Sequence, residues 1–306
     1  MIKYFSRAFK VTNENIILTT PLILFLFLLS IYLGVAQKAP VNLVSVFLLL
    51  VTILFMIGAF FAGWFFMVKK AVDLDRMEFV ADEDKARASF NLIKEVPVGI
   101  GEYFLPFIGA LILYSGLLAL LVFVGYQLGL HFIGKLGVSL VELKMAMDSP
   151  VAMKSLVSSL SSEQLVKLNA WNFMLMGIMT FYSFITMFWG VQIVSKTKNP
   201  LIAFFQSVKF IFKNFLSAIV LFMYISIINF SVSLLNAFAM INPIVYFISM
   251  LIYFYFLVYV VVLIFLYYDR ENNPKLEEKS EANCPEGDCN SGADSLGQEQ
   301  PRDTES

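Results

Sequence analysis

Charged residues are scarce in this sequence, and their scarcity excludes several classes of protein. Asp, Glu, Lys and Arg make up only 15% of the 306 residues, whereas apolar residues make up 59%. Soluble domains have roughly 45–50% apolar residues, so this chain carries more apolar side chain than a soluble core accommodates. The formal net charge is −1, so no overall basic field indicates binding to a nucleic acid.

Residues typical of catalytic and metal centres are equally few. The chain has one histidine, His131, and two cysteines, Cys284 and Cys289, which are too few for a four-ligand zinc site. Acidic clusters at 73–78 and 82–84 alternate with Lys and Arg, which predicts a solvated, internally salt-bridged connection. No Gly-rich phosphate loop or serine-nucleophile motif occurs. We therefore expect a protein that is not an enzyme and binds no cofactor or metal.

Long apolar segments dominate the sequence. A helix rises 1.5 Å per residue, so crossing a hydrocarbon core of about 30 Å takes roughly 20 residues. Barrel strands would alternate apolar and polar residues, and these segments do not. The sequence therefore predicts an all-α fold, a polytopic bundle of about six transmembrane helices in residues 1–268 with lipid as its main partner. The predicted spans are 16–36, 43–68, 105–130, 171–194, 216–239 and 244–268.

The first span is longer than the core of a secretory signal peptide. We therefore expect it to be retained as a membrane helix, with cleavage as the alternative. Small residues four apart, such as Gly58 with Ala62 and Gly125 with Gly129, indicate close packing between helices.

Positive charge is distributed unequally between the two sides of the predicted bundle. Seventeen of the 22 Lys and Arg residues lie in the N-terminus, after the second and fourth spans, and in the C-terminal tail. Cytoplasmic loops carry the excess of positive charge, so both termini are predicted to be cytoplasmic. The residues on the other side are Lys38, Lys135, Lys144, Lys154 and Lys167.

Short amphipathic segments precede the first, third and fifth spans. In the first, cationic residues 3, 7 and 10 share one helical face, which is typical of a helix in the membrane surface. The second covers residues 82–98 and is predicted to end at Pro97. The third begins with Asn199, a good N-cap, and Pro200, which suits the first helical position.

The first and third amphipathic segments share a short pattern. Ala8-Phe9-Lys10 and Asn15 have the same spacing as Ser207-Val208-Lys209 and Asn214. The pattern indicates a unit of one amphipathic helix and two membrane helices that occurs three times along the chain. Similar composition alone is the alternative explanation.

Two further regions lie outside the spans. Residues 131–170 are predicted to form an outer-side helical segment, with apolar residues at helical spacing in 136–147 and a new helix starting at Pro150. Ser161 and Gln164 form a capping box at the next helix. A cap packed on the bundle is favoured over a binding lid. Residues 269–306 are polar and acidic and are predicted to form a disordered cytoplasmic tail.

The interiors of the six spans carry no Asp, Glu, Lys or Arg. Ion- and proton-coupled transporters usually keep ionisable groups there, so this absence argues against a coupled pump. The polar residues are amides and hydroxyls: Asn229, Ser233 and Asn236 share one face of the fifth span, and Gln192 lies in the fourth. They are predicted to form hydrogen bonds between helices. A polar path for a substrate is the alternative.

The segment Asn199-Pro200-Leu-Ile-Ala-Phe-Phe-Gln-Ser-Val-Lys209, leading through Asn214 into the fifth span, carries a resemblance. In this segment and in the six-span plan of residues 1–268, the chain resembles a group of bacterial membrane proteins. The group includes the membrane domain of some glycerophosphodiester phosphodiesterases. The resemblance implies a bacterial inner (plasma) membrane, and none of the phosphodiesterase catalytic residues carries over to this sequence.

Two functions are compatible with these features. The favoured one is a non-enzymatic scaffold in the bacterial envelope, or a partner of another membrane protein or of a second copy of the chain. The alternative is a passive transporter or channel for lipid-like or small hydrophobic substrates that uses the polar face of the fifth span.

Labelling of engineered cysteines tests the predicted orientation. In a chain with Cys284 and Cys289 replaced by serine, Lys38→Cys or Pro150→Cys introduces one thiol on the predicted outer side. We expect a membrane-impermeant maleimide to label both variants in intact cells. A Lys275→Cys variant should react only after permeabilisation, and the reverse pattern would invert the topology.

Overall fold

The computed structural model describes residues 2–38, 42–77, 82–135, 149–239 and 242–272, and all regular elements in these ranges are helices. Six helical segments are long and apolar enough to cross a membrane, which confirms the predicted fold class. The elements are α1 (Ile2–Glu14), η1 (Ile16–Thr19), α2 (Thr20–Ala36), α3 (Leu43–Leu74), α4 (Asp82–Asn91), η2 (Leu92–Lys94), α5 (Glu95–Phe132), α7 (Pro150–Ser159), α8 (Ser162–Thr186), α9 (Trp189–Ser195), α10 (Pro200–Lys213), α11 (Phe215–Ala239) and α12 (Pro243–Asn272).

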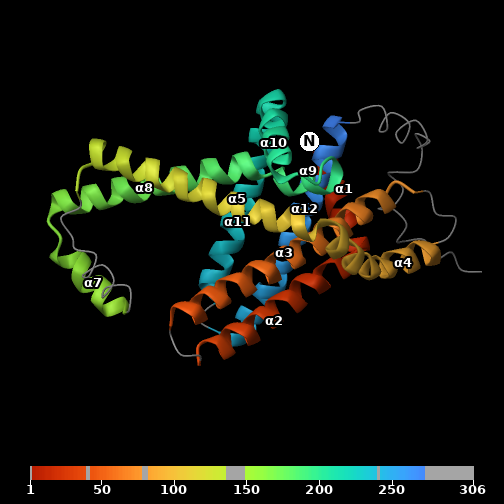
Figure 1. Ribbon diagram of the computed structural model, residues 1–306, viewed down its shortest axis with the longest axis horizontal. Helices are drawn as coiled ribbons and strands as arrows, with labels where there is room; N and C mark the ends of the chain where they lie inside the picture. Colours follow the sequence, from red (N-terminus) through yellow and green to blue (C-terminus); the bar gives the residue numbers. More distant parts are fainter. Residues whose placement is uncertain (1, 39–41, 78–81, 136–148, 240–241, 273–306) are drawn as a thin grey trace, which may run out of the picture.

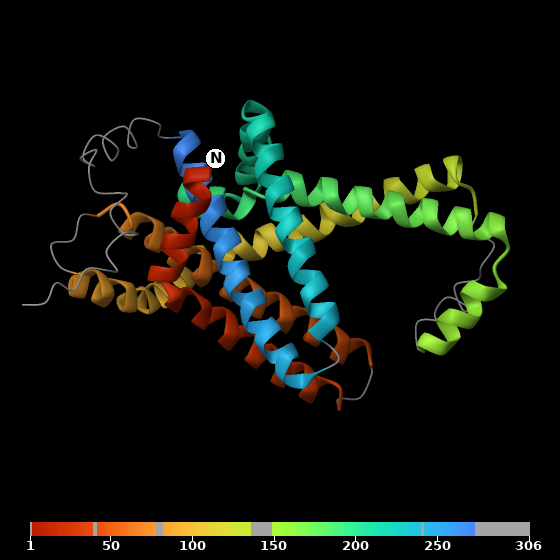
Figure 2. The ribbon, with the colours of Figure 1, turned by 180° about the vertical axis from the view of Figure 1, so that it is seen from behind.

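The membrane helices form three hairpins that meet at one end of the molecule; at their other ends, which we call the diverging ends, the α5–α8 hairpin lies far from the other two (Figures 1 and 2). The hairpins pair α2 with α3, α5 with α8 and its continuation α9, and α11 with α12. We call the end where they meet the base; it also includes α1, α4 and α10. The α5–α8 hairpin projects away from the other two, with α7 near its far end (Figure 1).

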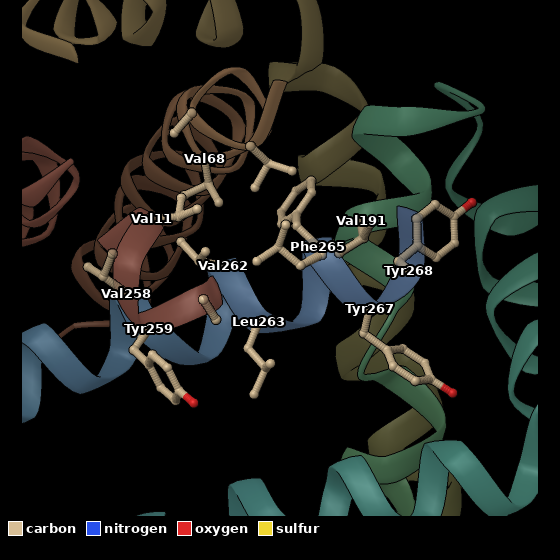
Figure 3. Packing of buried hydrophobic residues seen from close by; sticks show 14 of the residues in the cluster. Val11, Val68, Val191, Val258, Tyr259, Val262, Leu263, Phe265, Tyr267 and Tyr268 are labelled. Carbon is tan, nitrogen blue, oxygen red and sulfur yellow. The ribbon is translucent and has the colours of Figure 1, made fainter. Parts of the chain in front are cut away.

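The buried core lies at the base. Figure 3 shows side chains from four helices meeting there, including Val11 of α1, Val68 of α3, Val191 of α9 and Val262 of α12. The opposite ends of the hairpins are exposed, as the run of exposed residues from Ile244 to Ile248 in α12 illustrates. Lipid solvates apolar side chains as well as a protein core does, so these ends need no cover from the chain itself.

The second and third amphipathic helices, α4 and α10, each pack on the hairpin that precedes them in the sequence. Helix α4 and η2 contact α3, and α10 contacts α8 and α9. Helix α1 has no preceding hairpin in the sequence, and it packs on α12, the last helix of the third hairpin. The contact between α1 and α12 joins the first unit to the third, so the three units form a closed ring.

The sequence pattern shared by the first and third units corresponds to a shared backbone conformation. Asn15 follows α1 with φ −120° and ψ 48°, and Asn214 follows α10 with φ −115° and ψ 37°. Each amide side chain donates to the carbonyl four residues earlier, Asn15 to Val11 at 2.9 Å and Asn214 to Phe210 at 3.4 Å. The same residue type thus makes the same turn from an amphipathic helix into a membrane helix.

Three predicted boundaries differ from the structure. Helix α5 begins at Glu95, so Pro97 lies in its first turn, where a backbone N–H has no helical partner to lose. The fourth span is interrupted between Thr186 and Trp189, and the intervening Phe188 is buried at the base. Residues 269–272, predicted to belong to the tail, continue α12.

The outer-side segment is helical where the structure describes it. The capping box is present: Gln164 Oε1 accepts from the Ser161 N–H at 2.9 Å, and the Gln164 N–H donates to Ser161 Oγ at 3.3 Å. Helix α7 lies at the end of the projecting hairpin and away from the base, not over the bundle as predicted (Figure 1). The predicted helix in 136–147 and the tail residues 273–306 lie outside the described residues.

Helices α3 and α5 approach each other closely at Gly63 and Gly99. A Cβ atom on Gly99 would lie 2.6 Å from Cβ of Phe66 and 2.9 Å from the carbonyl oxygen of Ala62. A Cβ atom on Gly63 would lie 2.9 Å from the carbonyl oxygen of Val96. Side chains at either position would therefore push the two backbones apart.

Substitution of Gly99 tests this contact. We expect Gly99→Ala to destabilise the fold by about 1–3 kcal/mol, because the added methyl group overpacks the helix crossing. Gly101→Ala is the matched control, since no atom lies within 4 Å of its added Cβ. Thermal unfolding in detergent should show a lower midpoint for the first variant only; equal midpoints would contradict the proposed packing.

Candidate functional site

The four polar residues predicted to act inside the membrane do not form one site. Asn236 of α11 accepts a hydrogen bond from the Ser249 hydroxyl of α12, which is the predicted kind of bond between helices. Asn229 and Ser233 are exposed, and their side chains have no hydrogen-bond partner among the described residues. Asn236 therefore joins α11 to α12 within their hairpin. Asn229 and Ser233, on the same face of α11, are exposed at the surface of the described chain.

Gln192 belongs to a different part of the molecule. It is buried in α9, and its Oε1 accepts a hydrogen bond of 2.8 Å from the hydroxyl of Tyr268. Tyr268 and Ser249 lie 19 residues apart on α12, so Gln192 and the α11 amides are separated by about 28 Å along this helix. Gln192 therefore joins α9 to α12 at the base and is not part of the polar face of α11.

Ion pairs connect the helices of the base. Arg7 Nε of α1 lies 2.8 Å from Asp75 Oδ2, at the end of α3. Arg76 Nη2 lies 2.9 Å from Asp269 Oδ2 of α12. These pairs join α1 to α3 and α3 to α12, so they strengthen the closure of the ring.

A third polar contact gathers three helices at one backbone atom. The carbonyl oxygen of Val194, near the end of α9, accepts from Lys69 Nζ at 3.1 Å and from the hydroxyl of Tyr103 at 3.3 Å. Carbonyl groups at a helix C-terminus carry partial negative charge, which a nearby ammonium group stabilises. Lys69 thereby anchors α3, and Tyr103 anchors α5, on the same end of α9.

The acidic stretch after the second span is paired differently from the prediction. Within this stretch, Arg76 Nη1 lies 4.0 Å from Asp73 Oδ1. The closer ion pairs reach other elements, as Lys85 of α4 does with Glu14 of α1 at 2.8 Å. No group of three or more His, Cys, Asp or Glu in the described ranges is arranged to hold a metal ion.

Aromatic rings fill the space where the hairpins meet. Phe188 is 0% and Phe265 is 1% exposed, and the ring centroid of Phe265 lies 5.8 Å from that of Phe65. The Phe188 ring lies 5.6 Å from Tyr267 and 4.8 Å from Phe210. The centre of the base is thus occupied by apolar side chains from α3, α9, α10 and α12 (Figure 3).

The base contains contacts between helices far apart in the sequence that the sequence did not predict. Arg76 and Asp269 are 193 positions apart, and no motif or periodicity links residues at that separation. The sequence around Lys69 gave no indication of its hydrogen-bond partner, because that partner is a backbone carbonyl. The unequal distribution of positive charge indicated the cationic end of the molecule but not the individual pairs.

A double-mutant cycle tests whether Gln192 and Tyr268 form a structural pair. We expect Gln192→Leu and Tyr268→Phe each to lower the free energy of unfolding by about 1–3 kcal/mol, because each leaves a buried polar group without its partner. The double variant should lose less than the sum of the two, by about 0.5–2 kcal/mol. Strictly additive losses in detergent unfolding would show that the two side chains act independently.

Comparison with known proteins finds no match to this chain among family models, curated proteins or solved structures. The similarity to the membrane domain of glycerophosphodiester phosphodiesterases therefore stays a prediction from the sequence.

Proposed function

We propose that this chain is a non-enzymatic scaffold of a bacterial inner membrane that holds another membrane protein through its projecting hairpin. The proposal rests on the difference between the tightly joined base and one hairpin that projects from it. The base is joined by ion pairs and an aromatic core, whereas residues 116–132 of α5 and 162–181 of α8 project away from the other two hairpins (Figures 1 and 2). We call this projecting part the arm.

Charge supports an orientation with the base and both termini in the cytoplasm. The base carries Arg7, Lys69, Arg76, Lys196 and many other cations, whereas the described cations at the diverging ends are few. An excess of Lys and Arg marks the cytoplasmic side of membrane proteins. The described cations at the diverging ends are Lys38, Lys135, Lys154 and Lys167.

The inner side of the arm is well packed. A Cβ atom on Gly129 would lie 2.6 Å from Cζ3 of Trp171, and the Tyr182 hydroxyl donates to the Tyr114 carbonyl at 2.6 Å on the base side of the arm. These contacts hold α5 against α8. The arm is therefore a stable hairpin and can present a fixed outer surface to a partner.

The outer side of the arm is free within the described chain. Gly116 and Gly177 have no atom within 4 Å of an added Cβ, and Leu120 and Phe173 are exposed. Membrane helices associate through small residues that allow close approach, because apolar side chains alone gain little over lipid. An outer surface with exposed glycines is thus suited to a helix of another protein.

Photo-crosslinking tests the scaffold function. We expect a photoreactive residue at Leu120 or Phe173 to give one adduct of fixed mass in native membranes, and the same residue at exposed Phe27 of α2 to give lipid adducts only. Gly177→Leu should reduce the arm adduct at least fivefold without changing the thermal midpoint, because an added Cβ at Gly177 meets no other helix of the described chain within 4 Å. Lipid adducts alone from both arm positions would overturn the proposal.

The exposed Asn229 and Ser233 favour a second candidate, a passive path for lipid-like substrates along the surface of α11. Such a path would run beside the base, whose centre is filled by aromatic rings. It requires the Asn229 side chain, whereas the scaffold does not. In liposomes, we expect Asn229→Leu to leave the transfer of fluorescent phospholipid between leaflets unchanged, with wild-type protein and empty liposomes as references. A severalfold loss of transfer with intact folding would favour the transport function instead.

A further inference from the structure

Helix α10 lies on the base and buries only one of its sides. Ala203, Ser207, Phe210 and Ile211 are buried, and the Ser207 hydroxyl donates to the Ile185 carbonyl at 3.3 Å. The Asn199 side chain caps the helix by accepting from the Leu201 and Ile202 N–H groups. This side fixes α10 firmly on the second hairpin.

The opposite side of α10 is apolar and exposed. Phe205 is 66% and Phe212 is 67% exposed, and Leu201 lies beside them on the same helical face. At 100° per residue, these three positions fall within a narrow sector of the helix. Exposed aromatic rings in a helix at the end of a membrane bundle are typical of contact with the boundary between headgroups and acyl chains.

Two lysines border this apolar strip. Lys209 and Lys213 are exposed and one turn apart, which separates them by about 6 Å along the helix axis. Neither lysine has a carboxylate within 4.0 Å among the described residues, whereas several other cations of the base are paired with one. Lys10, the residue of α1 that corresponds to Lys209 in the repeated pattern, has Glu14 at 4.0 Å.

We propose that the outer side of α10 binds the headgroups of anionic phospholipids in the membrane leaflet at the base. Phe205 and Phe212 enter the acyl region, and the ammonium groups of Lys209 and Lys213 pair with headgroup phosphate. Charge complementarity selects this occupant, because the face carries two cations and no acid. Each lysine near an anionic membrane surface contributes about 1 kcal/mol of attraction to the headgroups, a severalfold gain in affinity, so two lysines give a modest preference. The proposal does not depend on the function of the arm.

Native mass spectrometry of the full chain in detergent tests the lipid preference. We expect phosphatidylglycerol to bind roughly tenfold more tightly than phosphatidylcholine, because each lysine at a membrane surface contributes a severalfold gain. Lys209→Gln/Lys213→Gln should reduce the preference to about twofold or less. Inorganic phosphate in millimolar excess should not displace the lipid, since the apolar strip contributes only to lipid binding.

The matched control removes two charges elsewhere. Lys154→Gln/Lys167→Gln lowers the net charge equally, and both lysines lie at the far end of the molecule, where Lys167 is paired with Glu163 at 2.6 Å. We expect this variant to keep the preference, and both variants to keep the thermal midpoint of the wild type. Equal loss in both variants, or equal binding of the two lipids by the wild type, would overturn the proposal. Displacement by inorganic phosphate would also overturn it, because it would indicate an anion site instead of a lipid site.

Discussion

The contact between α1 and α12 is the constraint on which the rest of the structure depends. The other contacts between consecutive units follow from their order in the chain, but this one joins residues from opposite ends. Ala8 and Val11 are fully buried with Val258 and Val262, and the Arg270 guanidinium lies 4.1 Å from the centre of the Tyr4 ring. Once α1 lies on α12, Arg7 can reach Asp75 and the three hairpins share one core.

The membrane environment explains why that core lies at one end. In lipid, helices gain little by hiding apolar side chains from their surroundings, so association depends on close packing and polar contacts. The base has both: the Gly63–Gly99 crossing brings backbones together, and the carbonyl of Val194 gathers Lys69 and Tyr103. The diverging ends have fewer such contacts between hairpins, and lipid satisfies their apolar surface.

Features that depend on nearby residues were predictable from the sequence. Segment length indicated six membrane helices, and the side chains of Asn199 and Ser161 marked helix starts that the structure reproduces. Features that depend on distant residues were not. The break before Trp189 places the Phe188 ring among residues from other helices, and the extension of α12 past Tyr268 places Asp269 where it accepts a hydrogen bond from Arg76.

In the candidate site, too, contacts between nearby residues could be predicted from the sequence and contacts between distant residues could not. A helical period groups three polar residues of α11 on one face, but among these three only Asn236 forms a hydrogen bond with a side chain of the neighbouring helix in the described chain. It could not show that Gln192 faces Tyr268, because the break in the fourth span changes which side of the chain faces inward. Among the cations, local sequence predicts the charge of a face, but the partners come from the fold. Lys10 and Lys209 share one pattern, yet only Lys10 has an acid within its own helix, and the lipid site proposed on α10 rests in part on this difference.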